Sequence, residues 1–564
     1  MGADRPTGLP GQRRDPRHHR RNPMSTRTFG EAIMDLVADT LDTDTVFGIP
    51  GVHTIELYRG VHRRGLRSVV PRHEQGAGFM ADGYTRVTGK PGVCLLVTGP
   101  GLINALTPVA QAWHDSQPML VLAAATASTD LGRGRGPLHD VNDQAAIAAP
   151  VTSISEVVTD PDRFAELLGQ AVAGWAAGRP RPVHLAVPTD LLARPTGPIT
   201  PAPVTARPPR PKAAELAAAA TLLAGARRSV LVVGGGAVDA AAQIRSLAER
   251  LDAPVITTGN AKGLLPEDHP LSVGTLLPFP APLRLLADAD VVLAVGTEFS
   301  EVDRIYTGAP LGITGAVVRV DIDPAQLHEP VPARVGLVGN AAEVLDDLQR
   351  ALTGSGVAPG RADEDGAVRA GRARQVEFTG QTDGHRPWLA AMADVRTPDT
   401  VVALDSTQLA YSAIHVLGAQ RPRTWLAPYG LGTLGPALPM AVGARVGRPD
   451  VPVMAVAGDG GLLFTIAELA TAVDEGGPLT LVVWDNAGYG EIRDSFDRAG
   501  APRVGTETTA HDIVAIARGF GAFATRADDP DAFRRDLKAA ADRPGVSVVV
   551  ATDPTGCTRP GGRS

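Results

Sequence analysis

The chain has 564 residues, of which 44% are hydrophobic and 20% are charged. This is an ordinary globular composition, and at roughly 100–200 residues per domain the length predicts about three or four domains. One small module and wholesale disorder are both excluded. The 54 Lys and Arg against 61 Asp and Glu give a net charge of −7, the wrong sign for binding a phosphate backbone, so no nucleic-acid partner is expected.

Cysteine content and hydropathy indicate the cellular compartment in which the protein is expected. The 2 cysteines, Cys94 and Cys557, lie far apart in the sequence and do not indicate a disulfide framework. No stretch reaches the ~18 uninterrupted apolar residues of a membrane helix, and the N-terminus lacks the apolar run of a secretory signal. We therefore expect a cytoplasmic protein with no membrane partner.

The first segment of the chain is rich in Arg, Pro and Gly and has almost nothing to bury. Residues 1–23 are therefore predicted to be a disordered extension. Met24 directly precedes a helical pattern over residues 28–41, which favours a start codon assigned too far upstream. A targeting or nucleic-acid-binding arm is the alternative.

From residue 24 onward, short apolar runs bounded by Gly or Pro alternate with amphipathic segments, which is typical of parallel sheets flanked by helices. A proline-rich segment at 194–211 and a segment rich in Gly, Arg, Asp and Glu at 355–380 break this pattern and are predicted linkers. The prediction is an α/β protein with three doubly wound parallel-sheet domains. These domains are expected at residues 24–193, 212–354 and 381–555.

A glycine run follows the first predicted strand of the second domain, at residues 234–236. It matches only part of the dinucleotide-binding pattern, which also needs a correctly spaced third small residue and an acidic residue about 20 positions on. A tight turn between strand and helix is the favoured interpretation, and nucleotide binding is the alternative.

The third domain carries a Gly-Asp-Gly-Gly sequence at the end of a predicted strand, and Asn486 ends the next strand. Carboxylate and amide oxygens at neighbouring strand ends suit Mg²⁺, which shares its ligands with phosphates. The glycines let backbone N–H groups approach those phosphates. A bare sequence of this kind is often only a turn, but its spacing to Asn486 favours a phosphate site. The residues concerned are Gly458, Asp459, Gly460 and Gly461.

This arrangement resembles the thiamine diphosphate-binding motif. The resemblance implies that Asp459 and Asn486 bind Mg²⁺ through their side chains and that Gly488 binds it through its carbonyl. The family usually has Asn-Asn where this chain has Asp485 followed by Asn486. The substituted position is not a ligand in the family, so the implied metal set is unchanged.

A second motif lies in the first domain, where Arg-His-Glu-Gln-Gly-Ala-Gly at 72–78 is followed by Gly-Tyr-Thr-Arg at 83–86. These sequences resemble the N-terminal domain of acetohydroxyacid synthases and related 2-oxo acid decarboxylases. Glu74 alone would be unremarkable on a surface helix. The resemblance implies that it hydrogen-bonds the N1′ atom of the cofactor's aminopyrimidine, which favours the imino tautomer that removes the C2 proton.

Two further segments resemble the same family. In the segment 429–436 the resemblance implies that Leu434 is the apolar wedge under the cofactor and that Gly432 accepts from the 4′-amino group. The synthases usually have Met at the wedge, and Leu is also an ordinary packing residue. In the segment 47–54 the resemblance implies that His53 borders the reacting carbon, where a neutral imidazole would relay a proton. A solvent-facing histidine is the alternative.

Three segments predict the reaction, namely 47–61, 405–408 and 486–494. They look more like the corresponding segments of 5-guanidino-2-oxopentanoate decarboxylases than those of acetohydroxyacid synthases. Glu491 and Asp494 would lie on a helix leaving the active site, where a carboxylate can pair with a guanidinium. A solvated helix N-terminus is an equal alternative for both residues. Gln408 is a further candidate on the phosphate or substrate side.

The predicted reaction is thiamine diphosphate- and Mg²⁺-dependent decarboxylation of a 2-oxo acid, with 5-guanidino-2-oxopentanoate giving 4-guanidinobutanal and CO₂. Acetolactate synthase-type carboligation of pyruvate and a non-catalytic cofactor-binding paralogue are the alternatives. The segment 296–304 lacks the FAD-binding pattern of the synthases, and residues 139–141 replace their Phe-Gln-Glu, so FAD is doubtful. In the family the two cofactor-binding ends meet between subunits, which implies a homodimer or homotetramer.

Overall fold

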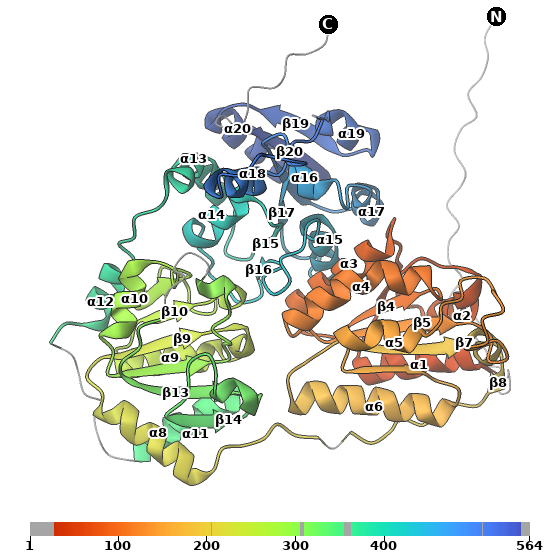
Figure 1. Cartoon of the computed structure of the whole chain (residues 1–564), viewed down its shortest axis with the longest axis horizontal. Coiled ribbons are helices and arrows are strands. Elements are labelled where there is room, and N and C mark those ends of the chain that lie inside the picture. Colours follow the sequence, from red (N-terminus) through yellow and green to blue (C-terminus); the bar gives the residue numbers. More distant parts are fainter. Residues whose placement is uncertain (1–26, 205, 305–309, 355–362, 510, 554–564) are drawn as a thin grey trace, which may run out of the picture.

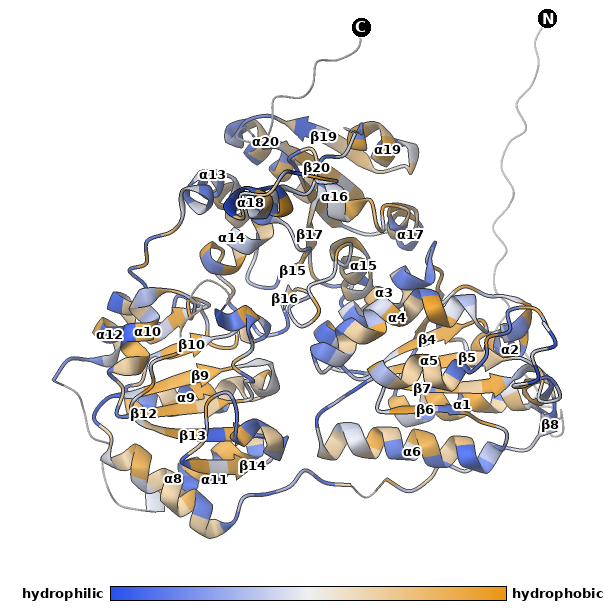
Figure 2. Cartoon of the chain, in the orientation of Figure 1, coloured by the Kyte–Doolittle hydropathy of each residue, from blue (hydrophilic) through white to orange (hydrophobic). Residues whose placement is uncertain are grey.

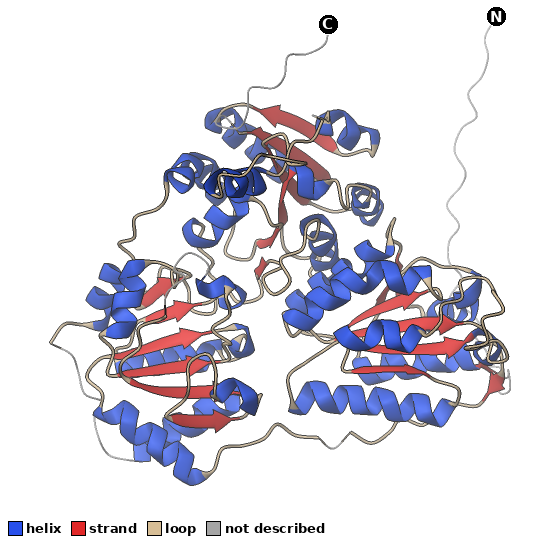
Figure 3. Cartoon of the chain, in the orientation of Figure 1, coloured by secondary structure: helices blue, strands red, loops and turns tan. Residues whose placement is uncertain are grey.

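The computed structural model describes residues 27–204, 206–304, 310–354, 363–509 and 511–553. The predicted disordered extension at 1–23 and Cys557 lie outside the described residues. Three six-stranded sheets follow one another along the chain, each flanked by helices (Figures 1 and 3). The prediction of an α/β protein with three doubly wound parallel-sheet domains is confirmed, and the boundaries proposed between the domains stay predictions.

The first sheet has the order β3-β2-β4-β5-β7-β6, with all of its strands parallel. Its central strands are buried on both faces because helices cover both sides, which explains their continuous apolar sequences. A short antiparallel pair, β1 and β8, joins the two ends of this domain. The strands are β1 (Arg27–Thr28), β2 (Thr45–Phe47), β3 (Arg67–Val69), β4 (Gly92–Leu96), β5 (Met119–Ala125), β6 (Ile154–Val157), β7 (Val183–Pro188) and β8 (Pro195–Thr196). The helices are α1 (Phe29–Leu41), α2 (Ile55–Arg64), α3 (Glu74–Thr88), α4 (Pro100–His114), α5 (Gln144–Ala148), α6 (Pro161–Ala177) and α7 (Thr189–Leu192).

The third sheet has the order β16-β15-β17-β18-β20-β19 and is also wholly parallel. Its strands are β15 (Val401–Leu404), β16 (Trp425–Leu426), β17 (Val453–Gly458), β18 (Leu479–Asp485), β19 (Phe523–Ala527) and β20 (Val546–Thr552). Its helices are α13 (Gly380–Asp394), α14 (Gln408–Val416), α15 (Ala437–Gly447), α16 (Asp459–Leu462), α17 (Glu468–Glu475), α18 (Gly490–Arg498), α19 (Ile513–Gly519) and α20 (Pro530–Ala541).

The first and third sheets share one topology. In each, the first strand of the sheet lies between the second and the third, so the chain leaves neighbouring strands in opposite directions. Such a switch point opens a crevice outside the carboxyl ends of the strands, where ligands bind in open α/β sheets. The switch points lie between β2 and β4 and between β15 and β17.

The central sheet has the order β11-β10-β9-β12-β13-β14. The glycine run after β9 forms a tight turn, in which Gly236 N–H donates to Gly296 O at 3.0 Å. The predictions about FAD and nucleotides stay predictions. The strands are β9 (Ser229–Val233), β10 (Val255–Thr257), β11 (Ser272–Gly274), β12 (Val291–Val295), β13 (Ala316–Asp321) and β14 (Val335–Val338). The helices are α8 (Ala213–Gly225), α9 (Ala241–Leu251), α10 (Pro280–Ala287), α11 (Ala341–Gly354) and α12 (Gly366–Ala373).

The first and third domains share a hydrophobic core at the crossing of α3 and α15. A Cβ atom at Gly83 would lie 2.2 Å from the Met440 carbonyl oxygen, and one at Gly443 would lie 1.9 Å from that of Met80. The two helices can therefore approach this closely only with glycine at both positions. Figure 2 shows the apolar strands inside the domains and the more polar surfaces of the helices outside.

Within the described ranges, no helix is long and apolar enough to cross a membrane. The expectations about compartment and nucleic acid stay predictions.

Candidate active site

Three oxygen atoms converge at the carboxyl edge of the third sheet. Asp459 begins α16 directly after β17, and Asn486 follows β18. Asn486 Oδ1 lies 2.8 Å from Gly488 O and 3.2 Å from Asp459 Oδ1. Gly488 has a φ of 145°, a region that favours glycine and that turns the loop back toward Asn486.

This oxygen set fits a hard cation. Oxygen atoms at these separations with no hydrogen between them repel each other, and a cation between them removes that repulsion. Burial, with a smaller effect of the nearby Asp485 carboxylate, raises the pKa of Asp459 to about 6. Among the described residues, no three His, Cys, Asp or Glu side chains form a metal cluster, so a cation here depends on amide and carbonyl oxygens as well.

Asp485, where the family usually has Asn, does not join this oxygen set. Its Oδ2 atom pairs with Arg526 Nη1 of β19 at 2.6 Å. The substitution is therefore accommodated by an ion pair within the sheet.

The loop that carries Gly432 and Leu434 lies at the same edge. Asp405, which follows β15, accepts from Gly435 N–H through both carboxylate oxygens, at 3.1 and 3.0 Å. Ser406 Oγ donates to Gly432 O at 3.3 Å. Asp405 is 3% exposed, and burial raises its pKa to about 7. Asp405 and its neighbour thus hold the predicted cofactor loop beside α16.

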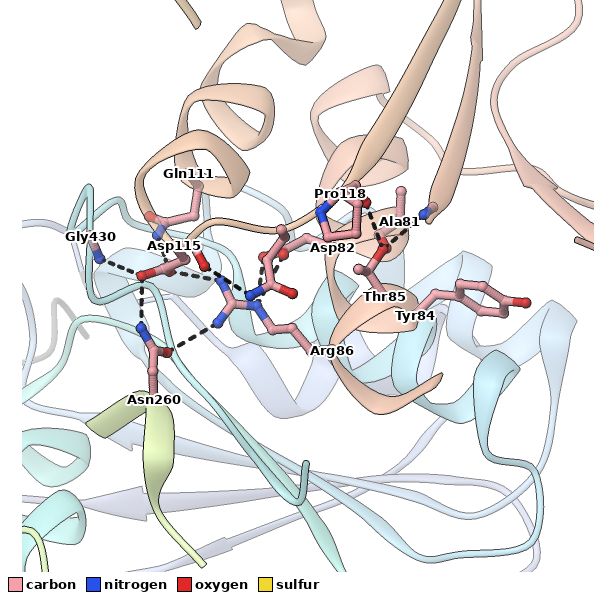
Figure 4. Close-up of polar contacts among 12 residues, drawn as sticks. Ala81, Asp82, Tyr84, Thr85, Arg86, Gln111, Asp115, Pro118, Asn260 and Gly430 are labelled. Carbon is pink, nitrogen blue, oxygen red and sulfur yellow. Dashed lines mark hydrogen bonds and ion pairs between the residues drawn. The ribbon is translucent and has the colours of Figure 1, made fainter. Parts of the chain in front are cut away.

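The beginning of this loop is anchored to the other two domains (Figure 4). Asp115, at the end of α4, accepts from Gly430 N–H at 3.0 Å and from Asn260 Nδ2 of the central domain at 3.0 Å. It also pairs with Arg86 of α3 at 2.7 Å. Arg86 pairs in turn with Asp82 at 3.0 Å. We call Asp82, Arg86, Asp115 and Asn260 the junction cluster, because these residues link the first and central domains and bind Gly430 of the third.

Glu74 is the first residue of α3, at the carboxyl edge of the first sheet. Asn104 Nδ2 donates to Glu74 Oε2 at 3.0 Å. The buried carboxylate of Glu468, from α17 of the third domain, accepts from the backbone N–H of His73 at 3.0 Å and of Arg72 at 3.1 Å. The start of α3, and with it Glu74, is therefore held by a residue of another domain.

His53 lies at the switch point of the first sheet, between β2 and α2. Its Nδ1 atom is 2.9 Å from Thr98 Oγ1, and its ring centroid is 5.2 Å from that of His139. Burial, with a smaller effect of His139, lowers the pKa of His53 below its usual 6.5, so the ring is neutral at pH 7. A cavity of about 300 Å³, lined by Thr98 and Asp140 among others, lies beside it.

The predicted residues thus form two groups, each at the carboxyl edge of one sheet. The first-domain group is Glu74 and His53, and the third-domain group is made of residues 432, 434, 458–461, 486 and 488. Within the described part of the chain, no hydrogen bond or ion pair joins Glu74 or His53 to the third-domain group. Two of the three predicted substrate-side residues, Gln408 and Asp494, are linked to Asn486 by hydrogen bonds, and the third, Glu491, is not linked to it by any hydrogen bond between described residues. Gln408 accepts from Asn486 Nδ2 at 3.1 Å and donates to Asp494 at 2.7 Å, whereas Glu491 pairs with Arg498 at 2.8 Å.

Sequence reasoning missed several residues that support these groups. Asp405 is not among them, because it lies in the segment 405–408, which directly follows an apolar strand and is predicted to form a phosphate-side or substrate-side loop. The missed residues carry no local signal, since their partners are distant in the chain. They are Thr98, Asn104, Asp115, His139 and Glu468.

Comparisons with known proteins agree with this organisation. Residues 27–147 match the thiamine pyrophosphate enzyme N-terminal TPP binding domain, 216–348 the central domain and 405–551 the C-terminal TPP binding domain. A probable 2-ketoarginine decarboxylase, AruI of Pseudomonas aeruginosa, is 42% identical over 93% of this chain and 94% of its own length. An acetolactate synthase of Mycobacterium leprae is 32% identical over 81% of this chain and 75% of its own length. The acetolactate synthase large subunit of Parasynechococcus marenigrum is 31% identical over 94% of this chain and 88% of its own length.

Proposed function

Because the chain belongs to the thiamine pyrophosphate enzymes, we propose that it uses thiamine diphosphate and Mg²⁺ to decarboxylate 5-guanidino-2-oxopentanoate (2-ketoarginine) to 4-guanidinobutanal and CO₂. The single observation that carries the Mg²⁺ part is the convergence of Asp459, Asn486 and Gly488 oxygens after neighbouring strands. The substrate part is supported by the 42% identity to a probable 2-ketoarginine decarboxylase.

The third-domain group would hold the diphosphate end of the cofactor. Asp459, Asn486 and Gly488 would bind the cation, and the backbone of Gly460 and Gly461 would approach the phosphates. Leu434 would support the cofactor from below and Gly432 O would accept from its 4′-amino group. When bound, the cofactor supplies a nucleophilic carbon and an electron sink for decarboxylation.

The first-domain group would carry out proton transfer. Glu74 would share a proton with the aminopyrimidine N1′, and Asn104 orients its carboxyl group by holding Oε2. The hydrogen bond between His53 Nδ1 and Thr98 directs the imidazole, so that Nε2 is the atom that would hold or release a proton. The lowered pKa of His53 keeps the imidazole neutral at pH 7, so that the ring can accept a proton.

The two groups would meet between two copies of the chain. Exposed apolar side chains lie within a few residues, in the sequence, of the members of both groups or of residues that contact them, as expected for surfaces that a partner covers. Those near Glu74 and His53 are Val52, Ile55, Ile103 and Leu138, and those near the third-domain group are Leu431, Phe464 and Ile492. A homodimer or homotetramer with shared active sites is the assembly that we propose.

Of the two carboxylates predicted to bind the substrate guanidinium, we propose Glu491. Its present partner is the guanidinium of Arg498, which a substrate guanidinium can replace with the same geometry. Asp494 instead points toward Gln408.

The test is reconstitution of cofactor-free, chelator-treated protein. Addition of thiamine diphosphate and Mg²⁺ together should restore CO₂ release from 2-ketoarginine, and neither alone should suffice. A panel of 2-oxo acids, with the second product identified, separates the alternatives. Acetolactate formed from pyruvate would favour the synthase, whose relatives are 31–32% identical, and no turnover with any substrate would favour a non-catalytic paralogue.

A further inference from the structure

Two hydrogen bonds in series connect α18 to Asn486. Asn486 Nδ2 donates to Gln408 Oε1 at 3.1 Å, and Gln408 Nε2 donates to Asp494 Oδ2 at 2.7 Å. Asn486 and Gln408 are both 6% exposed, and Asp494 is partly buried. We call these three residues the amide relay.

The charge at one end of the relay determines the direction of both amides. An ionised carboxylate only accepts hydrogen bonds, so Asp494 requires the NH₂ group of Gln408 to face it. The oxygen of Gln408 then faces Asn486 and requires the NH₂ group of Asn486. The remaining atom of that amide, Oδ1, is left facing Asp459 Oδ1 and Gly488 O.

The opposite orientation of Asn486 would give its NH₂ group two acceptors but would place its oxygen against Gln408 Oε1, 3.1 Å away. Its NH₂ group would then donate to Gly488 O and Asp459 Oδ1, at 2.8 and 3.2 Å. In that state two N–H hydrogens would occupy the space between the oxygens and exclude a cation. The amide shape does not distinguish the two states, but the hydrogen-bonding partners do.

Neighbouring residues restrict the loop and the space around this amide. Arg493 Nη2 donates to Asn486 O at 2.7 Å, which holds the backbone of the loop. A Cβ atom at Gly490 would lie 2.2 Å from Asn486 Nδ2 and 2.6 Å from Gln408 Oε1, so the relay occupies the space of a missing side chain.

We propose that Asp494 and Gln408 are positioning residues that hold Oδ1 of Asn486 toward the cation site. This inference rests on the proposed function, because it takes the cation to be the Mg²⁺ that binds with thiamine diphosphate. It gives Asp494 a role that does not depend on the substrate.

The test measures cation affinity without substrate. Binding of Mn²⁺ in the presence of saturating thiamine diphosphate is followed by the loss of the electron paramagnetic resonance signal of free Mn²⁺. Asp494→Leu should weaken this affinity about 10- to 100-fold, as is typical when a residue behind a metal ligand is removed. Asp497→Leu is the matched control, since Asp497 lies on the same helix and pairs with the exposed Arg503 at 2.9 Å. Its affinity should equal that of the wild type.

Two variants that keep a polar side chain at position 494 serve if Asp494→Leu does not fold. Asp494→Asn can either donate or accept, so both orientations of the relay become populated and the affinity should fall. Adding Gln408→Glu should restore it, because a carboxylate at 408 accepts from both neighbouring amides and again requires the NH₂ group of Asn486. The double variant keeps the net charge of the wild type.

The outcomes distinguish the proposed function from the positioning role of Asp494 and Gln408. Wild-type protein that binds no Mn²⁺ with thiamine diphosphate would overturn the proposed function. Wild-type protein that binds it, together with unchanged affinity in Asp494→Leu or Asp494→Asn, would overturn only the positioning role. A loss of Mn²⁺ affinity in Asp494→Asn that the added Gln408→Glu does not reverse would also contradict the positioning role.

Discussion

Removal of the Asp115 carboxylate tests whether the junction cluster holds the three domains together. In Asp115→Ala, Arg86 keeps only Asp82 as its charged partner. The Arg86 side chain is only 6% exposed, so water cannot replace the lost carboxylate. Gly430 N–H and the amides of Gln111 and Asn260 also lose their acceptor. The variant therefore leaves a buried cation undercompensated and several donors unpaired.

The expected cost follows from this burial. Breaking a buried ion pair by removing one partner costs about 3–5 kcal/mol, and the neutral hydrogen bonds are not added separately because they share the same acceptor. At roughly 2–4 °C per kcal/mol for a domain of this size, the melting temperature should fall by roughly 6–20 °C. Because Gly430 begins the cofactor loop, the affinity for thiamine diphosphate should fall as well.

The assay is thermal unfolding by differential scanning fluorimetry at fixed protein concentration, with and without thiamine diphosphate and Mg²⁺. Asp450→Ala is the control, because Asp450 pairs with Arg448 on the surface, with 64% of its side chain exposed, and its loss should leave the melting temperature unchanged. A melting temperature of Asp115→Ala equal to that of the control would refute the reasoning that the cluster contributes to stability.

Three further predictions concern the candidate site. Glu74→Gln should retain thiamine diphosphate but lose orders of magnitude in C2 hydrogen–deuterium exchange of the bound cofactor, and an unchanged exchange rate would assign Glu74 another role. Glu491→Gln should lower kcat/KM for 2-ketoarginine about tenfold and leave that for pyruvate unchanged, whereas equal losses would make this carboxylate structural. Burial raises the pKa of Asp405 to about 7 in the folded protein, compared with about 4 in the unfolded chain. The protonated carboxyl group therefore stabilises the folded state fully below about pH 4, and this contribution is lost as the pH rises to about 7. Asp405→Asn lacks this titration, so in cofactor-free protein its melting temperature should rise relative to that of the wild type between pH 4 and 7, and a constant difference would contradict the shift.

The sequence alone determined the architecture and predicted the residues of both groups. Alternating apolar runs and amphipathic segments indicate parallel strands covered on both faces by helices, because both surfaces of such strands are apolar. In such a sheet every strand ends at the same edge. Asp459 and Asn486, each placed just after an apolar strand, therefore lie at one edge, and the pairing of β17 with β18 makes them neighbours.

Only the tertiary structure decided which residues support these groups. Asp115 contacts Gly430, Glu468 contacts His73, and Asp494 contacts Gln408, each through a partner far away in the chain. A carboxylate that is buried against a distant N–H group has the same sequence context as one in solvent. What distinguishes them is burial, which makes an unpaired charge costly and so requires each of these partners, and burial exists only once the chain has folded.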